Sequence, residues 1–231
     1  MTNHTILKPL PEDQWFIESQ ELRSFVATVR EISASTADDR TQTLARLEPY
    51  FQELLAQQEW LPEKFAQINP ESKMGGGIGQ WLLYRAKDRS LSVFSLVIPP
   101  GSTTPVHDHL AWGLIGLYKG NQEETVYRRV DNGDAEGHAQ LQVTEVRRLN
   151  PPQASLQPGD IYCLLPPDGD IHAVKTTSQS ASVSIHLLGN DTGCILRHQF
   201  IPESHSVKSF RSGYSNAPCK EEEEKEHAQV R

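Results

Sequence analysis

Residues 99–120 read PPGSTTPVHDHLAWGLIGLYKG, and this segment is the most informative stretch of the chain. Side chains two positions apart on a β-strand project from the same face, so His107 and His109 would point together while Asp108 points away. Two imidazoles on one face can bind one metal ion, and the stretch PPDGDIHAV supplies a third candidate ligand in His172. A histidine pair alone also fits ordinary strand histidines, so the pattern by itself leaves both interpretations open.

The sequence around this segment is typical of β-structure. From residue 80 onward, short apolar runs such as LSVFSLVI, IHAVKT and SVSIHLL alternate with turn signals such as PPGS, VDNGD and GNDTG. About nine such runs, with no helix-period stretch between them, predict an antiparallel sandwich or barrel. A chain this rich in strand edges is best protected when its sheets close on themselves.

The N-terminal part has a different pattern. Apolar residues recur at helical spacing over residues 13–70, which predicts helices there. Ser35 or Thr36 is a candidate N-cap for the second helix, and Pro62 suits the first turn of a short third helix that ends before Pro70. We expect these helices to pack as a wall on the β-rich part.

Composition and charge exclude several classes of protein. The net charge of -8 disfavours nucleic acid as a partner, although half of that excess comes from EEEEKE at 221–226. The sequence has no apolar stretch of membrane length and no signal-peptide pattern, so we expect no membrane partner and a soluble, cytoplasmic protein. An odd number of cysteines without a CxxC motif favours free thiols in a reducing compartment. Of the three, Cys163 and Cys194 are expected to be small buried residues in strands, and Cys219 lies near the acidic tail.

The spacing around the histidines resembles the two motifs of the cupin superfamily. The first motif is matched by Gly101, His107, His109 and Gly120, and the second by Pro167, Gly169 and His172 after the turn glycine Gly159. Gly113 stands where the first motif usually has a glutamate ligand. The resemblance implies a mainly β fold, a cupin double-stranded β-helix barrel over residues 80–212, with a helical segment at 13–79 packed on it. Residues 1–12 and 213–231 are expected to be disordered.

Longer segments resemble the thiol dioxygenases, which are iron cupins that include cysteine dioxygenase and bacterial 3-mercaptopropionate dioxygenase. The similar segments are QWLLY, SVFSLVIPPGSTTPVHDH, WGLIGLYKG, SVSIHLLG and RSGYSN, within about residues 80–216. The resemblance implies Fe(II) held by His107, His109 and His172, although three imidazoles also suit zinc or another divalent metal. Gly113 is also the residue that bacterial members commonly have at this position.

The same resemblance assigns catalytic roles close to the metal. Ser184 and His186 match the first two members of a Ser-x-His-x-Tyr motif, but Leu188 replaces its tyrosine. This replacement removes a hydroxyl donor and opens an apolar space. Activity then either continues at a lower rate or is directed to a bulkier, different substrate.

Three residues are candidates for binding a substrate carboxylate. Arg197 matches the arginine that does so in the 3-mercaptopropionate type, and Gln80 matches, more loosely, a glutamine that lines that pocket. Arg85 is a competing candidate, because cysteine dioxygenases use an arginine from this region. His198 alternates with Arg197 and would face the opposite side of its strand.

These observations predict an Fe(II)-dependent dioxygenase that oxidises a small carboxylate-bearing thiol to a sulfinate. Its partners would be the small-molecule thiol and dioxygen. Two alternatives stay open: a metal-dependent cupin with lyase or isomerase chemistry, and a non-catalytic cupin that binds a small molecule.

Overall fold

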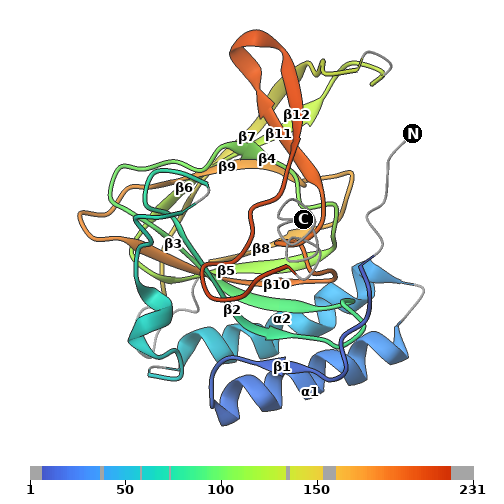
Figure 1. The fold of residues 1–231 in the computed structure, drawn as a ribbon, viewed down its shortest axis with the longest axis vertical. Helices are drawn as coiled ribbons and strands as arrows, with labels where there is room; N and C mark the ends of the chain where they lie inside the picture. Colours follow the sequence, from blue (N-terminus) through green and yellow to red (C-terminus); the bar gives the residue numbers. More distant parts are fainter. Residues whose placement is uncertain are drawn as a thin grey trace, which may run out of the picture.

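The structure is a computed structural model that describes residues 7–36, 39–57, 59–72, 74–133, 136–152 and 160–219. Two six-stranded antiparallel sheets face each other (Figure 1). The first sheet has, in spatial order, β1 (Gln14–Trp15), β2 (Gly79–Arg85), β3 (Ser92–Ile98), β10 (Ser182–Leu188), β5 (Gly113–Lys119) and β8 (Ile161–Leu164). The second has β12 (Ser206–Phe210), β11 (Arg197–Ile201), β4 (Val106–His107), β9 (Ile171–Thr176), β6 (Gln122–Arg129) and β7 (Leu141–Leu149).

Strands that are far apart in the sequence pair as neighbours in both sheets. In the first sheet β10 lies between β3 and β5, and in the second β9 lies between β4 and β6. This interleaving of an earlier and a later set of strands gives the double-stranded β-helix of a cupin. The predicted fold, mainly β with an N-terminal helical segment, is confirmed.

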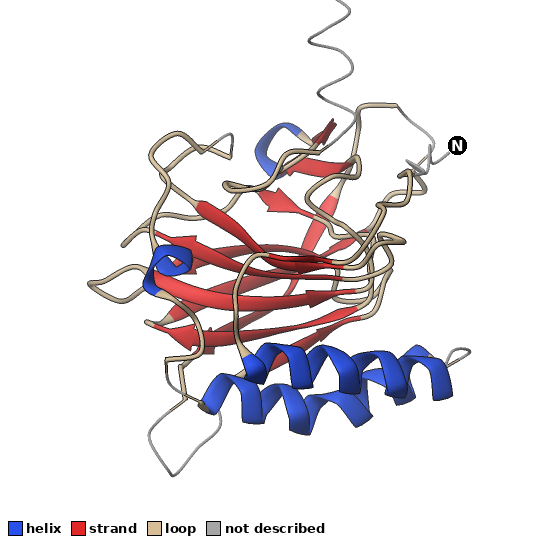
Figure 2. Ribbon diagram, turned by 60° about the horizontal axis from the view of Figure 1, so that its bottom comes forward, coloured by secondary structure: helices blue, strands red, loops and turns tan. Residues whose placement is uncertain are grey.

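Two helices, α1 (Gln20–Ser35) and α2 (Arg40–Ala56), cover the outer face of the first sheet (Figure 2). A Cβ on Gly116 of β5 would lie 2.3 Å from Leu55 Cδ1 and 3.1 Å from Phe51 Cε1, so α2 packs directly on the strand backbone. A short 3-10 helix at Glu63–Ala66 continues this wall. The apolar stripe that indicated helices is therefore the surface that binds them to the sheet.

The second helix starts later than predicted. Asp39, not Ser35 or Thr36, is its N-cap, and its side chain accepts a hydrogen bond of 2.9 Å from the Gln42 amide. Thr36 instead ends α1, where its hydroxyl donates to the Ile32 carbonyl at 2.7 Å. Both residue types cap helices, so composition alone did not separate the two positions.

Alternation along β10 separates the two hydrophobic cores. Val183, Ile185 and Leu187 pack with the helices, whereas Leu188 packs in the cluster inside the barrel. Ser184 and His186 share the parity of Leu188 and so also point inward. The inside of the barrel therefore combines an apolar lining with a few buried polar side chains.

The predictions of disorder at the two ends of the chain were wrong for the residues that the structure describes there. Residues 213–219 were expected to be disordered, but the Ser215 amide donates to the Gln80 carbonyl at 2.7 Å, and Asn216 bonds both the amide and the carbonyl of Leu82. Leu10, in the N-terminal segment also expected to be disordered, is buried. The polar residues after 212 satisfy the main chain of β2, which their composition did not reveal. The predictions for residues 1–6 and 220–231 lie outside the described residues.

The cysteine prediction was wrong. Cys194 and Cys219 form a disulfide across 25 residues of sequence, and the free Cys163 is exposed rather than buried. Cys194 is buried but lies in a turn before β11. An odd count allows one bridge plus one free thiol, so the count did not support a reducing compartment. Neither helix in the described part of the chain has the length and apolar character needed to cross a membrane.

Candidate metal centre

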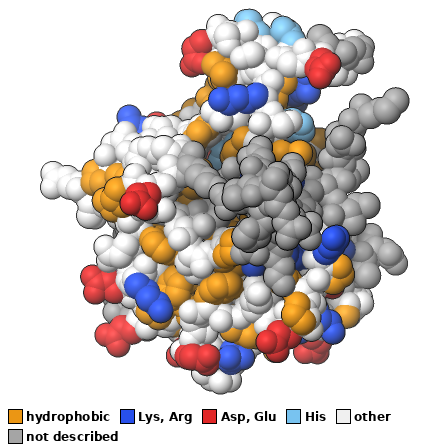
Figure 3. All heavy atoms as spheres, in the orientation of Figure 1, with side chains coloured by type: hydrophobic (Ala, Val, Ile, Leu, Met, Phe, Trp, Pro, Cys, Tyr) orange, Lys and Arg blue, Asp and Glu red, His pale blue; other side chains and the backbone are white. Residues whose placement is uncertain are grey.

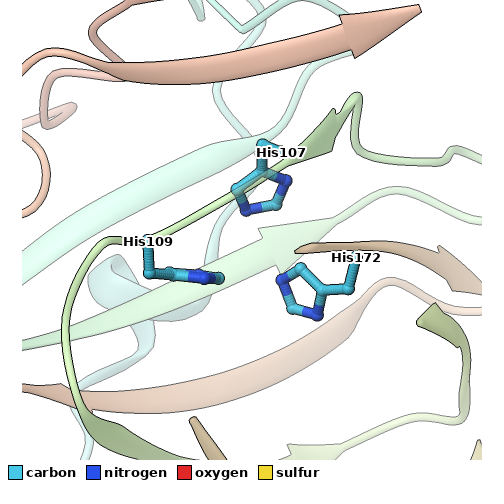
Figure 4. A group of neighbouring side chains, drawn as sticks. All are labelled: His107, His109 and His172. Atoms are coloured by element: carbon cyan, nitrogen blue, oxygen red, sulfur yellow. The ribbon is translucent and has the colours of Figure 1, made fainter. Parts of the chain in front are cut away.

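Three histidines from two separate parts of the chain meet between the sheets. His107 of β4 pairs in register with His172 of β9, and His109 lies two residues beyond His107 (Figure 4). Their ring centroids are 4.8–4.9 Å apart, and one ligand nitrogen from each lies within 4.8 Å of the others. The antiparallel pairing of β4 with β9 thus brings together the histidines of the two predicted motifs.

Hydrogen bonds to the Nδ1 atoms orient two of the rings. His107 Nδ1 lies 2.9 Å from the Pro105 carbonyl oxygen, and His172 Nδ1 lies 2.6 Å from Oε1 of Glu124. In each case the Nε2 atom remains as the donor for a metal. Asp170 holds the loop of His109 by accepting from its backbone amide at 2.8 Å, and its carboxylate lies 3.5 Å from His109 Nδ1.

Glu124 is a site residue that the sequence analysis missed. Its side chain is fully buried, and its second oxygen lies 3.0 Å from Nε of Arg147. Along β6 the buried positions alternate through Gln122, Glu124 and Val126. A glutamate on the same strand face as Val126 was the available signal, since a buried carboxylate needs a partner.

The electrostatics of the three rings suit metal binding. Burial, together with the neighbouring histidines, lowers the pKa of His107 and of His109 well below the usual imidazole value. Both imidazoles are then neutral near pH 7 and keep a lone pair for a cation. The donor set is three imidazole nitrogens with no carboxylate, which fits a divalent metal ion and leaves its charge available to anionic ligands.

Ser184 and His186 lie beside the three histidines, on β10. The hydroxyl of Ser184 is 3.0 Å from His186 Nε2, and the imidazole stacks on Phe94 with centroids 4.6 Å apart. The His186 ring centroid is 6.3 Å from that of His109. Burial lowers the pKa of His186 well below its usual range, so it is a neutral hydrogen-bonding group.

Leu188 of β10 and Gly113 of β5 are paired across the two strands and in close contact. Leu188 is fully buried, and a Cβ on Gly113 would lie 2.5 Å from Leu188 Cδ2 and 2.2 Å from the Leu187 carbonyl oxygen. The apolar side chain thus occupies the space beside Gly113. No side chain larger than hydrogen fits at position 113 without a shift of β10.

Arg197 and Gln80 line the same cavity as His107, His109 and His186. Arg197 is buried; it donates to the carbonyls of Thr192 and Asp108 and, at 2.9 Å, to the hydroxyl of Ser212. The amide of Gln80 donates to the same hydroxyl at 3.2 Å. Ser212 therefore holds both predicted carboxylate-binding residues, and it was not singled out from the sequence.

The structure does not bring Arg85 to this cavity. Its guanidinium donates to Gln14 at 2.5 and 3.0 Å and to Asp191 at 3.2 Å. Arg85 lies at the opposite end of β2 from Gln80 and is not among the residues that line the cavity. The prediction of Arg85 as an alternative carboxylate anchor is therefore corrected: its side chain is committed to a buried ion pair.

The remaining histidines that the structure describes lie away from the three-histidine group. His198 bonds to Asp108 through its Nδ1 at 2.6 Å and is partly exposed, whereas the neighbouring Arg197 is buried, which agrees with the expected alternation. Histidine side chains also gather at the tip of the β11–β12 end of the molecule (Figure 3), where the rings of His138 and His205 have centroids 6.1 Å apart. The turn glycine Gly159 and the two remaining tail histidines lie outside the described residues.

The structure thus combines a double-stranded β-helix of the cupin type with a three-histidine group able to hold a divalent metal ion. No protein family model matches the chain. Similar solved structures include recombinant oxalate oxidase in complex with glycolate, at 16% identity over 56% of this chain and 58% of that one, with a TM-score of 0.39. The alignment thus spans little more than half of the oxalate oxidase chain.

Two further structures are themselves described as cupins. The cupin domain of Cnp3 from Schizosaccharomyces pombe is 15% identical over 54% of this chain and 68% of its own, with a TM-score of 0.34. A Cupin 2 conserved barrel domain protein from Salinispora arenicola CNS-205 is 15% identical over 52% and 82%, with a TM-score of 0.33. Likeness at this level concerns the fold alone, and the assignment of the fold of this chain rests on its own strand order.

Proposed function

We propose that this protein is an Fe(II)-dependent dioxygenase that oxidises a small carboxylate-bearing thiol to a sulfinate. One observation carries the proposal: the buried cation of Arg197 lines the same cavity as His107 and His109. A cavity with a metal-binding group at one end and a fixed guanidinium beside it suits a short molecule that has an anionic group at each end.

Arg197 and Gln80 would hold the carboxylate of the substrate. An arginine has five N–H donors, and the contacts of Arg197 to Thr192, Asp108 and Ser212 use three of them. The remaining donors, with the amide of Gln80, can bind a carboxylate. Because the guanidinium is anchored by three bonds, little conformational freedom is lost when the substrate binds.

The thiol end would then lie near the three histidines. Fe(II), when bound by them, supplies the site for a thiolate and the activation of dioxygen. Both oxygen atoms pass to sulfur, so a thiol and one dioxygen give one sulfinate, and the S–H proton leaves to solvent. The Ser184–His186 pair offers a neutral hydrogen-bonding group, and the ring centroid of His186 lies 6.3 Å from that of His109. The protein contributes orientation and electrostatics.

The proposal is tested by oxygen consumption of iron-loaded protein over a panel of small thiols with and without a carboxylate. We expect uptake with mercaptocarboxylates and little with the matched mercaptoalcohols. Arg197→Lys should raise KM for the mercaptocarboxylate by at least tenfold, because a single ammonium cannot reproduce the anchored fork. Arg128→Lys, on an exposed part of β6, is the matched control. Absence of thiol-dependent uptake, with iron content verified, would reject the proposal.

The leucine at position 188 favours one alternative function, which a comparison of zinc-loaded and iron-loaded protein tests. Because an apolar side chain fills the position of the family tyrosine, the metal could instead act as a Lewis acid in lyase or isomerase chemistry. Such an enzyme would not depend on a redox-active ion. Activity that is equal with zinc and with iron would support this alternative, whereas activity with iron alone supports the dioxygenase.

A further inference from the structure

The Cys194–Cys219 disulfide fastens one wall of the candidate site. The segment 212–219 runs along β2, where the Ser215 amide donates to the Gln80 carbonyl and the Gly213 amide donates to the Gly193 carbonyl at 2.9 Å. Tyr214 donates from its hydroxyl to Asp191 at 2.8 Å. The disulfide at the end of this segment ties it to the turn that contains Cys194. We refer to residues 212–219 as the C-terminal wall.

The C-terminal wall supplies a partner that Arg197 and Gln80, the proposed carboxylate-binding pair, share. Its first residue, Ser212, accepts from both Arg197 and Gln80. If the wall moved away from β2, both side chains would lose a shared partner. This step rests on the proposed function, since it concerns the residues assigned to the substrate carboxylate.

A second cavity borders the disulfide at Cys219. It is lined by the C-terminal wall including Cys219, and it shares Met74 and Gln80 with the cavity of the histidines. We call it the vestibule, because a small molecule that approaches the histidines past Gln80 also meets Cys219. Cys219 is 3% exposed and Cys194 is 1% exposed, so large molecules do not reach the sulfur atoms.

The surroundings of Cys194 favour its release as a thiolate. Nη1 of Arg85 lies 3.6 Å from Cys194 Sγ. Arg85 and Arg89 share a single buried carboxylate, that of Asp191, so this cluster has one positive charge in excess. A cation beside a sulfur atom stabilises its thiolate and makes it a better leaving group in thiol–disulfide exchange.

We propose that Cys194–Cys219 is a thiol–disulfide exchange site for small thiols, and that its opening loosens the C-terminal wall. A small thiolate in the vestibule attacks Cys219 Sγ; a bond forms between the two sulfurs, the Cys219–Cys194 bond breaks, and its electron pair leaves on Cys194 beside Arg85. A second small thiolate then attacks the sulfur of the small molecule in this mixed disulfide. Two small thiols are oxidised to one disulfide, and the protein disulfide is reduced by two electrons.

The exchange is tested on metal-free protein, so that no dioxygenase activity enters the result. Protein is incubated with 3-mercaptopropionate or with thioredoxin, quenched in acid, alkylated and analysed by peptide mass spectrometry. We expect the small thiol to open the disulfide through a mixed disulfide on Cys219, and thioredoxin to open it at least tenfold more slowly. Arg85→Gln should slow the reaction several-fold, and Arg89→Gln, which removes the same charge farther from Cys194, should slow it less. A mixed disulfide on Cys194, or equal rates with both reductants, would overturn the exchange site.

The effect on the wall is read from amide hydrogen exchange of residues 212–219. Reduction of the wild-type protein, and the double substitution Cys194→Ser with Cys219→Ser, should each increase exchange there at least tenfold, while Cys163→Ser leaves it unchanged. If the double variant does not fold, hydrogen exchange in the reduced wild-type protein alone tests whether the disulfide holds the C-terminal wall. Unchanged exchange in reduced protein would overturn the wall hypothesis even if the dioxygenase proposal holds. In iron-loaded protein, reduction should also raise KM for mercaptocarboxylates several-fold.

Discussion

The imidazole of His172 is held by Glu124, whose Oε1 lies 2.6 Å from His172 Nδ1. The other oxygen of this carboxylate lies 3.0 Å from Nε of Arg147. The row of guanidinium, carboxylate and imidazole fixes the ring and leaves its Nε2 as the donor atom, an arrangement that strengthens metal ligands in general. Because Glu124 is fully buried, it also needs both partners to compensate for its charge.

Substitution of Glu124 by glutamine should weaken metal binding about 10- to 100-fold, because the neutral amide no longer supports His172 as a ligand. The measurement is competition with a chromophoric chelator for Fe(II) or Zn(II). Glu123→Gln is the matched control, since the neighbouring side chain is partly exposed and pairs only loosely with Arg148 at 3.7 Å. Equal metal affinity in the two variants would show that Glu124 does not support the ligand.

The metal-free protein should lose stability on acidification. Burial lowers the pKa of His109 and of His186 well below the usual imidazole value, so the unfolded chain binds protons near pH 6.5 that the folded chain does not. Their contribution to stability is thus complete above pH 6.5 and is lost as pH falls below it. His198 acts in the opposite direction, because its hydrogen bond to Asp108 raises its pKa, but its partial exposure weakens that effect.

Urea unfolding at pH 7.5 and pH 5.5 tests the expected direction of the change in stability with pH. We expect a lower unfolding free energy at pH 5.5 in wild-type protein and a smaller difference in His186→Gln, which keeps a partner for Ser184. A wild-type protein that is more stable at pH 5.5 would contradict the assignment of neutral buried histidines.

The sequence was sufficient to predict most of the strands but not the ones that complete the site. The short apolar runs IHAVKT and SVSIHLL coincide with the observed bounds of β9 and β10. The strand expected to carry both His107 and His109 is shorter than assumed: β4 is only Val106–His107, and its pairing with β9 and β11 rather than local propensity makes it a strand. β12 was also missed, since its residues, Ser206–Phe210, have mixed polarity and mostly partial exposure.

Local motifs predicted the three histidines of the candidate metal centre, whereas the residues that support them depend on long-range contacts. His107, His109 and His172 lie in short motifs with fixed spacing. Glu124 and Ser212 act through partners 48 and 15 residues away, so no short pattern marks them. The disulfide also depends on long-range contacts. Its two cysteines can be read from the sequence, but their pairing follows from the path of residues 213–219.

Leu188→Tyr should accelerate thiol oxidation if the family mechanism operates, because it returns a hydroxyl donor beside His186. The larger ring must enter a fully packed apolar cluster, so we also expect a loss of stability of about 1–3 kcal/mol. Oxygen uptake under saturating thiol and urea unfolding measure the two effects. Leu188→Phe adds the same bulk without the hydroxyl and is the control. Equal rates in the two variants would show that the hydroxyl has no catalytic role.

Gly113→Ala should destabilise the barrel through the backbone of β10 rather than through Leu188. The new Cβ would lie 2.2 Å from the Leu187 carbonyl oxygen as well as 2.5 Å from Leu188 Cδ2, and only the second contact involves a side chain that can be shortened. We expect the variant to lose about 1–3 kcal/mol in urea unfolding, the range for an overpacked interior. The variant that combines Gly113→Ala with Leu188→Ala should be less stable than Leu188→Ala alone, because the clash with the carbonyl remains. If the double variant were at least as stable as Leu188→Ala alone, the side chain of Leu188, and not the strand backbone, would be what requires glycine at position 113.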